Sequence, residues 1–153
     1  MAGMNFNMKK LLILYTSKTG NTQSFVDWFE EQFSNQFDIT CFNLYRDKNL
    51  TNIEQYDIIA LGSYTWANGK IPVEMKRFVI ENRELLQEKV AFLFGSGITI
   101  YAHFCAALDS IQIILDKEIY SIKFELTFIP EEHTEEIDKL EGILNEYVFT
   151  DKK

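Results

Sequence analysis

The sequence predicts a single α/β domain whose core is a doubly wound, five-stranded parallel sheet with helices on both faces. Five short apolar segments alternate with amphipathic helical patterns, and no repeat, linker or low-complexity tract interrupts them. The first apolar segment, Lys10–Tyr15, has no polar alternation, which is typical of a strand buried on both faces. Hydrophobic residues make up 46% of the 153 residues, enough for one sizeable core. We expect one domain over residues 1–153, with residues 1–8 as a flexible or added start.

Four further apolar segments complete the expected sheet. They span Phe37–Leu44, Tyr56–Leu61, Val90–Phe94 and Ile119–Phe128. The first of these four alternates only in part, which suits an edge strand. We expect glycines to end the next two, at Gly62 and at Gly95–Gly97.

Helical spacing of apolar residues occurs in four of the intervals between and after these strands. The four patterns run over Phe25–Phe33, Pro72–Val79, Phe104–Leu115 and Ile137–Tyr147. Pro72 stands where the second pattern begins, and proline is tolerated in the first turn of a helix. Strand and helix therefore alternate along the chain, as in an open α/β sheet.

The charge and the cysteine count restrict the class of protein. A net charge of −8 argues against a nucleic-acid binder, whose affinity depends on neutralising phosphates. Such a charge steers the chain toward basic partner surfaces or serves only solubility, and both interpretations stay open here. Cys41 and Cys105 form neither a CxxC pair nor a cluster, which indicates reduced thiols in a cytoplasmic protein. His103 and His133 lack metal-ligand spacing, and no apolar stretch is long enough to span a bilayer.

The stretch YTSKTGNT follows the first predicted strand and is rich in hydroxyl and amide groups. Ligands of open α/β sheets bind outside the carboxyl ends of the strands, so this position is diagnostic. Gly20 allows a close backbone approach, and a helix follows whose free N–H groups would attract an anion. The polar residues concerned are Thr16, Ser17, Thr19, Asn21 and Thr22. An ordinary helix cap explains the same stretch when it is taken alone.

Two other loops are expected at the same edge of the sheet. GSYTWANGK follows the third strand and carries Trp66, and FGSGITIYAHFC follows the fourth and carries Tyr101. An anion-binding loop beside two aromatic rings is what a phosphorylated planar ring system requires. Each ring taken singly could instead belong to the core, but the agreement of three loops favours binding.

These three loops resemble those of the short-chain flavodoxins. The similarity runs from Lys9 to about Tyr147, and it includes the S/T-x-T-G-N-T phosphate signature at residues 17–22. GSYTW resembles the loop that places a tryptophan over the inner flavin face. GSGITIYAHFC resembles the loop whose tyrosine stacks on the outer face, and it ends in the family's Phe-Cys pair. The chain has no room for the insertion that long-chain members carry in the fifth strand. The resemblance implies the strand order 2-1-3-4-5.

The resemblance further implies noncovalently bound FMN that cycles among quinone, semiquinone and hydroquinone, with no substrate turnover, catalytic residue or metal. The implied partners are a flavodoxin reductase and acceptor enzymes, bound transiently and electrostatically by a monomer, with neither nucleic acid nor membrane. The implied cofactor-binding residues are Thr16, Ser17, Lys18, Thr19, Gly20, Asn21, Thr22, Tyr64, Thr65, Trp66, Ala67, Asn68, Gly69, Gly95, Ser96, Gly97, Ile98, Tyr101, Phe104 and Cys105.

The chain departs from the family pattern near the expected flavin. Ala67 and Asn68 stand where many members have Gly-Asp, and Ile98 stands where they have an aspartate. Lys70 adds a positive charge. These changes make the expected flavin surroundings less acidic, so we expect the two reduction potentials to lie closer together than is usual. We expect Cys105 to be a buried helix residue rather than a reactive thiol.

Three alternative functions compete with that of an electron carrier, and the first two share its topology. The first is a flavodoxin-like activator of manganese ribonucleotide reductase, whose flavin site is also less acidic. The second is a phospho-acceptor signalling domain, which needs acidic residues that YTSKT and GSYTW do not supply. The third is a flavin-dependent quinone reductase, which usually needs longer loops and an oligomer.

Overall fold

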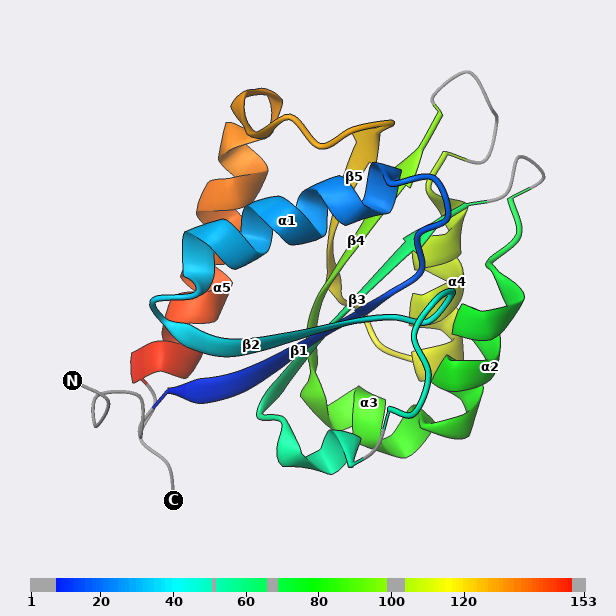
Figure 1. The fold of residues 1–153 in the computed structure, drawn as a ribbon, viewed down its shortest axis with the longest axis horizontal. Coiled ribbons are helices and arrows are strands. Elements are labelled where there is room, and N and C mark those ends of the chain that lie inside the picture. Colours follow the sequence, from blue (N-terminus) through cyan, green and yellow to red (C-terminus); the bar gives the residue numbers. More distant parts are fainter. Residues whose placement is uncertain (1–7, 51, 66–68, 99–103, 150–153) are drawn as a thin grey trace.

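The computed structural model describes residues 8–50, 52–65, 69–98 and 104–149. Its five strands form one sheet in the order β2-β1-β3-β4-β5, and every neighbouring pair is parallel (Figure 1). The strands are β1 (Lys9–Tyr15), β2 (Phe37–Asn43), β3 (Ile58–Tyr64), β4 (Val90–Gly97) and β5 (Tyr120–Glu125). The predicted fold class and strand order are confirmed. The strand order reverses between β1 and β3, which creates the switch point at which open α/β sheets bind ligands.

Helices cover both faces of the sheet. Figure 1 shows α1 (Asn21–Phe33) and α5 (Thr134–Phe149) on one face. The helices α2 (Val73–Glu81), α3 (Arg83–Lys89) and α4 (Ala106–Leu115) pack on the other. Two short 3₁₀ turns, η2 (Ile53–Gln55) and η3 (Pro130–Glu132), lie in the connections. Within the described ranges, no helix combines the length and the apolar character needed to cross a bilayer.

β1 contributes to the core on both sides, which explains its unbroken run of apolar residues. Leu11 and Ile13 pack in the cluster under α1 and α5, while Leu12 and Leu14 pack under α2 and α4. All four side chains are fully buried. A polar side chain at any of these positions would lose its contacts with water and find no hydrogen-bond partner in their place, which would destabilise the fold. β1 is therefore anchored in both halves of the core, and the first loop begins where this strand ends.

β3 and β4 extend further than the sequence predicts, because their glycines do not end the ladder. Gly62 pairs with Phe94, and the parallel pairing continues through Ser63 with Gly95 and Tyr64 with Ser96. The ring of Phe94 occupies the space that a side chain at Gly62 would fill. The small residues thus continue two strands toward the ligand edge instead of turning the chain.

Other elements also differ from the predictions. β5 ends at Glu125 because Leu126 adopts a positive φ of 59°, which breaks the extended backbone. The sequence pattern missed α3, a short helix in which only Leu86 is buried. Pro72 lies just before α2 rather than in its first turn, and its carbonyl accepts the N–H of Lys76.

Candidate functional site

A cavity of about 300 Å³ opens at the carboxyl ends of β1, β3 and β4. It lies at the switch point of the sheet, and residues from all three of the predicted loops line it. These residues are Ser17, Lys18, Thr19, Asn21, Thr22, Tyr64, Thr65, Ser96, Gly97 and Ile98. Of them, Lys18 is the one cation and none is a carboxylate, so the described wall suits an anion.

The first loop ends in a left-handed glycine rather than in a side-chain cap. Gly20 is the N-cap of α1, with φ 98°, and no side chain at that position accepts a hydrogen bond from the helix. Ser17 Oγ accepts the N–H of Gln23 at 3.2 Å. The N–H groups of Asn21 and Thr22 lie in the first turn, where no intrahelical acceptor exists. Since both residues line the cavity, the helix start offers donors and a positive dipole end to a ligand.

A buried hydroxyl pair joins the first loop to β4. The Oγ1 atom of Thr22 lies 3.0 Å from the Oγ atom of Ser96, and both side chains are almost completely buried. Their mutual bond uses one of the two hydroxyl protons. The other proton is therefore available to an acceptor in the cavity that both residues line.

Thr16 belongs to a second buried chain of hydroxyls. Its Oγ1 donates to Ser63 Oγ at 3.3 Å, and Ser63 Oγ donates to the carbonyl of Tyr64 at 2.7 Å. Both protons are used inside the protein, and Thr16 does not contribute to the described cavity wall. In this structure Thr16 joins the first loop to β3, and its contact with a ligand stays a prediction.

The second loop forms the opposite wall. Tyr64 and Thr65 line the cavity, and Thr65 Oγ1 accepts the N–H of Ala107 at 3.0 Å at the start of α4. Burial, with a smaller effect of nearby Glu74, raises the pKa of Tyr64 to about 12. Tyr64 is therefore neutral at physiological pH and retains its hydroxyl proton.

The third wall comes from the end of β4. Gly97 and Ile98 line the cavity, and a side chain at Gly97 would meet Phe104 and Cys105 at 3.0–3.1 Å. Cys105 is 1% exposed and its Sγ lies 3.5 Å from the carbonyl oxygen of Gly95. Cys105 is thus buried as predicted, although it immediately precedes α4 rather than lying within it.

Both thiols are expected to resist alkylation in the folded protein. Burial raises the pKa of Cys105 and of Cys41 to about 12, from an ordinary 9.0. At pH 8 the thiolate fraction is roughly a thousandfold smaller than that of a free cysteine. The pKa of each thiol is higher in the folded chain than in the unfolded chain, so the folded chain holds the thiol protons more tightly. The contribution of the thiols to the free energy of unfolding is therefore fully present at neutral pH and is lost as the pH rises toward 12. Iodoacetamide at pH 8 should label the urea-unfolded chain rapidly and the native chain hardly at all, and equal rates would contradict this result.

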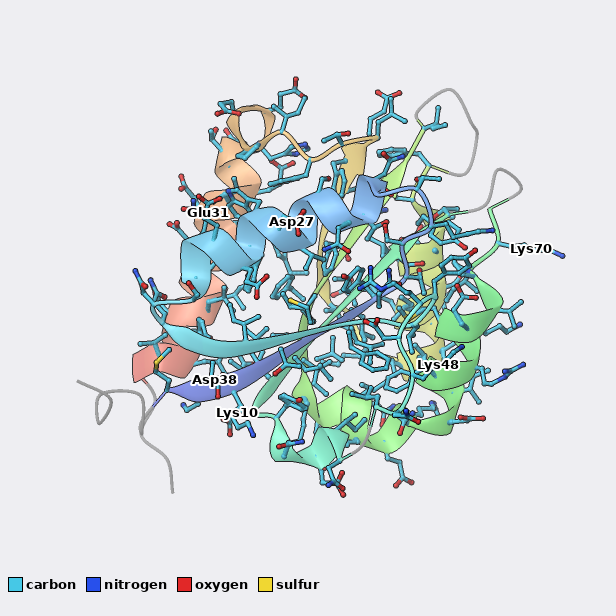
Figure 2. The ribbon with its side chains drawn as sticks, in the orientation of Figure 1. Lys10, Asp27, Glu31, Asp38, Lys48 and Lys70 are labelled. Carbon is cyan, nitrogen blue, oxygen red and sulfur yellow. The ribbon has the colours of Figure 1, made fainter. Side chains whose placement is uncertain are left out.

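Four predicted site residues, Trp66, Ala67, Asn68 and Tyr101, lie outside the described residues. Gly69, just after the first three, has a positive φ of 86°. Gly95 is buried in β4. Figure 2 shows the side chain of Lys70 directed away from the body of the protein near the start of α2.

Sequence reasoning missed Asn43, the last residue of β2. Its side chain is buried and forms hydrogen bonds with the backbone of Ser17, so it connects the edge strand to the first loop. The available signal was an amide between the apolar residues Phe42 and Leu44, at the carboxyl end of a strand. A buried amide there needs backbone partners, and the neighbouring loop supplies them.

The fold and the site together define a class of protein. An open α/β sheet with the start of a helix, suited to an anion, at its switch point is an arrangement typical of mononucleotide-binding domains. No group of three or more histidine, cysteine or acidic side chains that could hold a metal ion occurs in the part of the chain that the structure describes.

Comparisons with known proteins identify the family. The Flavodoxin family model matches residues 13–141. Flavodoxin of Maridesulfovibrio salexigens is 34% identical over 117 residues, which cover 72% of this chain and 78% of that protein. Probable flavodoxin 2 of Bacillus subtilis is 30% identical over 107 residues, which cover 69% of this chain and 71% of that protein.

Solved structures agree with this family. The crystal structure of oxidised flavodoxin 2 from Bacillus cereus has a TM-score of 0.67 and 31% identity, covering 90% of this chain and 99% of that one. Oxidised flavodoxin 1 from the same organism has a TM-score of 0.73 and 25% identity, covering 89% of this chain and 97% of that one. The chain belongs to the flavodoxin family, and it is an FMN-binding electron-transfer protein rather than an enzyme.

Proposed function

We propose that the cavity binds the phosphate end of FMN and that the chain carries single electrons from a flavodoxin reductase to acceptor enzymes. The observation that carries this proposal is the start of α1. There, Asn21 and Thr22 bring first-turn N–H groups to a cavity that hydroxyl side chains also line. These donors suit a doubly charged phosphate, because hydrogen bonds to an ionised acceptor are about twice as strong as neutral ones.

The residues of the cavity divide into two roles in this proposal. Thr19, Asn21 and Thr22 donate hydrogen bonds to the phosphate, and Lys18 contributes a positive charge at the cavity mouth. Tyr64 and Ile98 bound the space between the phosphate and the ring system, which reaches toward Trp66 and Tyr101 as the family resemblance implies. Bound FMN supplies a ring that accepts and releases electrons one at a time.

The partner proteins in this proposal meet the chain transiently and by electrostatic attraction. The net charge of −8 supports an encounter with basic surfaces, which raises association rates without requiring a large interface. Figure 2 shows Asp27 and Glu31 on α1, and both side chains are exposed. We propose a cytoplasmic monomer, consistent with two cysteines that remain free.

The activator of manganese ribonucleotide reductase is not favoured over an electron carrier. Three similar curated proteins bear the names Flavodoxin, Probable flavodoxin 1 and Probable flavodoxin 2. Ile98, an uncharged residue in the cavity wall, is a described feature that agrees with the less acidic flavin site of such an activator.

Flavin fluorescence tests whether Trp66 and Tyr101 flank the ring. Aromatic side chains in contact with the flavin should quench its emission in the holoprotein. We expect strong quenching in the wild type and recovery in Trp66→Ala or Tyr101→Ala. Trp28→Phe is the control, because Trp28 packs against the aromatic core cluster under α1. This substitution should leave the quenching of the flavin unchanged. Unaltered emission and FMN affinity in both site variants would mean that the two rings lie elsewhere.

The Ile98→Asp variant is expected to lower the second reduction potential. A carboxylate ~10 Å from the flavin, at an effective dielectric constant of ~20, opposes added negative charge by roughly 1–2 kcal/mol. Since ~1.4 kcal/mol corresponds to about 59 mV for one electron, the expected shift is on the order of 50 mV. Ile98→Asn is the matched control, because it is polar but uncharged. Equal second potentials in the two variants, measured by redox titration, would show that this position does not tune the flavin.

A further inference from the structure

Asn43 ends the edge strand β2 and holds a buried bridge between two loops. Its side chain is 2% exposed. The Oδ1 atom accepts the N–H of Ser17 at 3.2 Å and the N–H of Tyr45 at 3.1 Å. The Nδ2 atom donates to the carbonyl of Ser17 at 3.1 Å. One side chain therefore satisfies both backbone groups of Ser17 and an N–H group of the loop after β2.

The contacts with Ser17 attach the first loop to the end of β2. Ser17 lines the cavity, and its Oγ accepts the N–H of Gln23 in the first turn of α1. The loop is also held to β3 through the N–H of Thr16, which donates to the carbonyl of Gly62 at 3.0 Å. Without the Asn43 amide, a buried N–H and a buried carbonyl of Ser17 would lose their partners, so the backbone would move to find others.

The contact with Tyr45 connects Asn43 to the charged side of the cavity. The Nζ atom of Lys18 lies 5.4 Å from the centre of the Tyr45 ring, within the range of a cation–π interaction. Lys18 is exposed and lines the cavity mouth. By holding the backbone of Tyr45, Asn43 also positions the ring on which this ammonium group rests.

We propose that Asn43 is a positioning residue that determines the preference of this chain for a phosphorylated over an unphosphorylated flavin. This inference rests on the proposed function, because it takes the cavity to be the phosphate site. Asn43 is not part of the cavity wall and acts through Ser17 and Lys18. Its effect is preorganisation: donors held in place before binding lose less conformational freedom when the phosphate arrives.

The test compares FMN with riboflavin, which lacks the phosphate. Dissociation constants of both flavins are measured on the apoprotein by fluorescence quenching for wild type, Asn43→Ala and Asn82→Ala. Asn82 is the matched control, since its Nδ2 also donates to a backbone carbonyl, that of Phe78, at 2.9 Å but lies between α2 and α3. We expect Asn43→Ala to weaken FMN about tenfold or more and riboflavin less than about threefold, while the control keeps the wild-type ratio.

Asn43→Asp is the second variant. It keeps the acceptor for the N–H groups of Ser17 and Tyr45 but loses the donor to the Ser17 carbonyl and adds a negative charge, so it should also weaken FMN selectively. Equal loss of both flavins in the variants that fold, or an unchanged FMN affinity, would overturn the proposal. Failure of both variants to fold would likewise overturn it in favour of a purely structural role. A wild type that binds FMN no tighter than riboflavin would instead contradict the proposed function.

Discussion

The Gly62→Ala variant is expected to lose about 3 kcal/mol or more of its free energy of unfolding, a large part of the total for a domain of this size. A methyl group at Gly62 would overlap the ring of Phe94 on β4. That ring cannot move aside easily, because it is fully buried and stacks on Phe25, with 4.4 Å between the ring centres. The strain would fall on β3 and β4, the two strands that carry the second and third walls of the cavity.

Gly142→Ala provides the matched control for this substitution. Gly142 lies in the middle of α5, and a methyl group there would meet no atom within 4 Å. Because glycine is an unfavourable residue inside a helix, this variant should gain roughly 0.5–1 kcal/mol. Urea unfolding of the apoproteins measures both changes from the midpoints at a constant slope. Equal midpoints for the two variants would contradict the packing of Phe94 over Gly62.

Thr22→Ala is expected to reduce FMN affinity by about one to two decades, the largest functional effect among the single substitutions. It removes a hydroxyl of the buried Thr22–Ser96 pair, whose spare proton faces a charged ligand in the proposed site. A hydrogen bond to an ionised group contributes roughly 1.5–3 kcal/mol, which corresponds to that loss of affinity. Thr19 is exposed on the same loop, and Thr19→Ala should also reduce the affinity for FMN.

Thr22→Ser separates the hydroxyl from the methyl group of the side chain. It keeps the oxygen that contacts Ser96, so its FMN affinity should stay within about threefold of wild type while its stability falls slightly. Isothermal titration of the apoproteins with FMN gives the dissociation constants of the wild type and of the three variants. Wild-type affinity in both Thr19→Ala and Thr22→Ala would place the ligand elsewhere or indicate a ligand without a phosphate.

The fold could be predicted from the sequence because hydrophobic burial determines it over whole segments. The apolar run of β1 predicted burial on both faces, and the two core clusters on either side of the strand confirm it. Boundaries that depend on single residues were less predictable. Gly62 and Gly95 look like strand ends in the sequence, yet the pairing of β3 with β4 continues through both. Glycine is needed there because Phe94 and the carbonyl oxygen of Ser63 occupy the space that a side chain would fill.

The site was predictable to the extent that its residues are consecutive in the chain. The loop from Ser17 to Thr22 carries a recognisable pattern, and most of its residues line the cavity. Asn43 was not predictable in this way, because its role depends on the pairing of β2 with β1, which brings it opposite Tyr15 and next to the loop. The amide after an apolar run indicates that Asn43 needs hydrogen-bond partners, but the loop that supplies them follows from the strand register, which the spacing of residues does not reveal.

Stepwise anaerobic reduction of the protein reconstituted with FMN, followed by visible absorption at known potentials, tests the central claim most directly. We expect the apoprotein to take up one FMN per chain and the holoprotein to be reduced in two resolved one-electron steps, without turnover of NADH and quinone. Failure to retain FMN, or reduction only by a single two-electron step accompanied by quinone turnover, would contradict an FMN-binding carrier of single electrons.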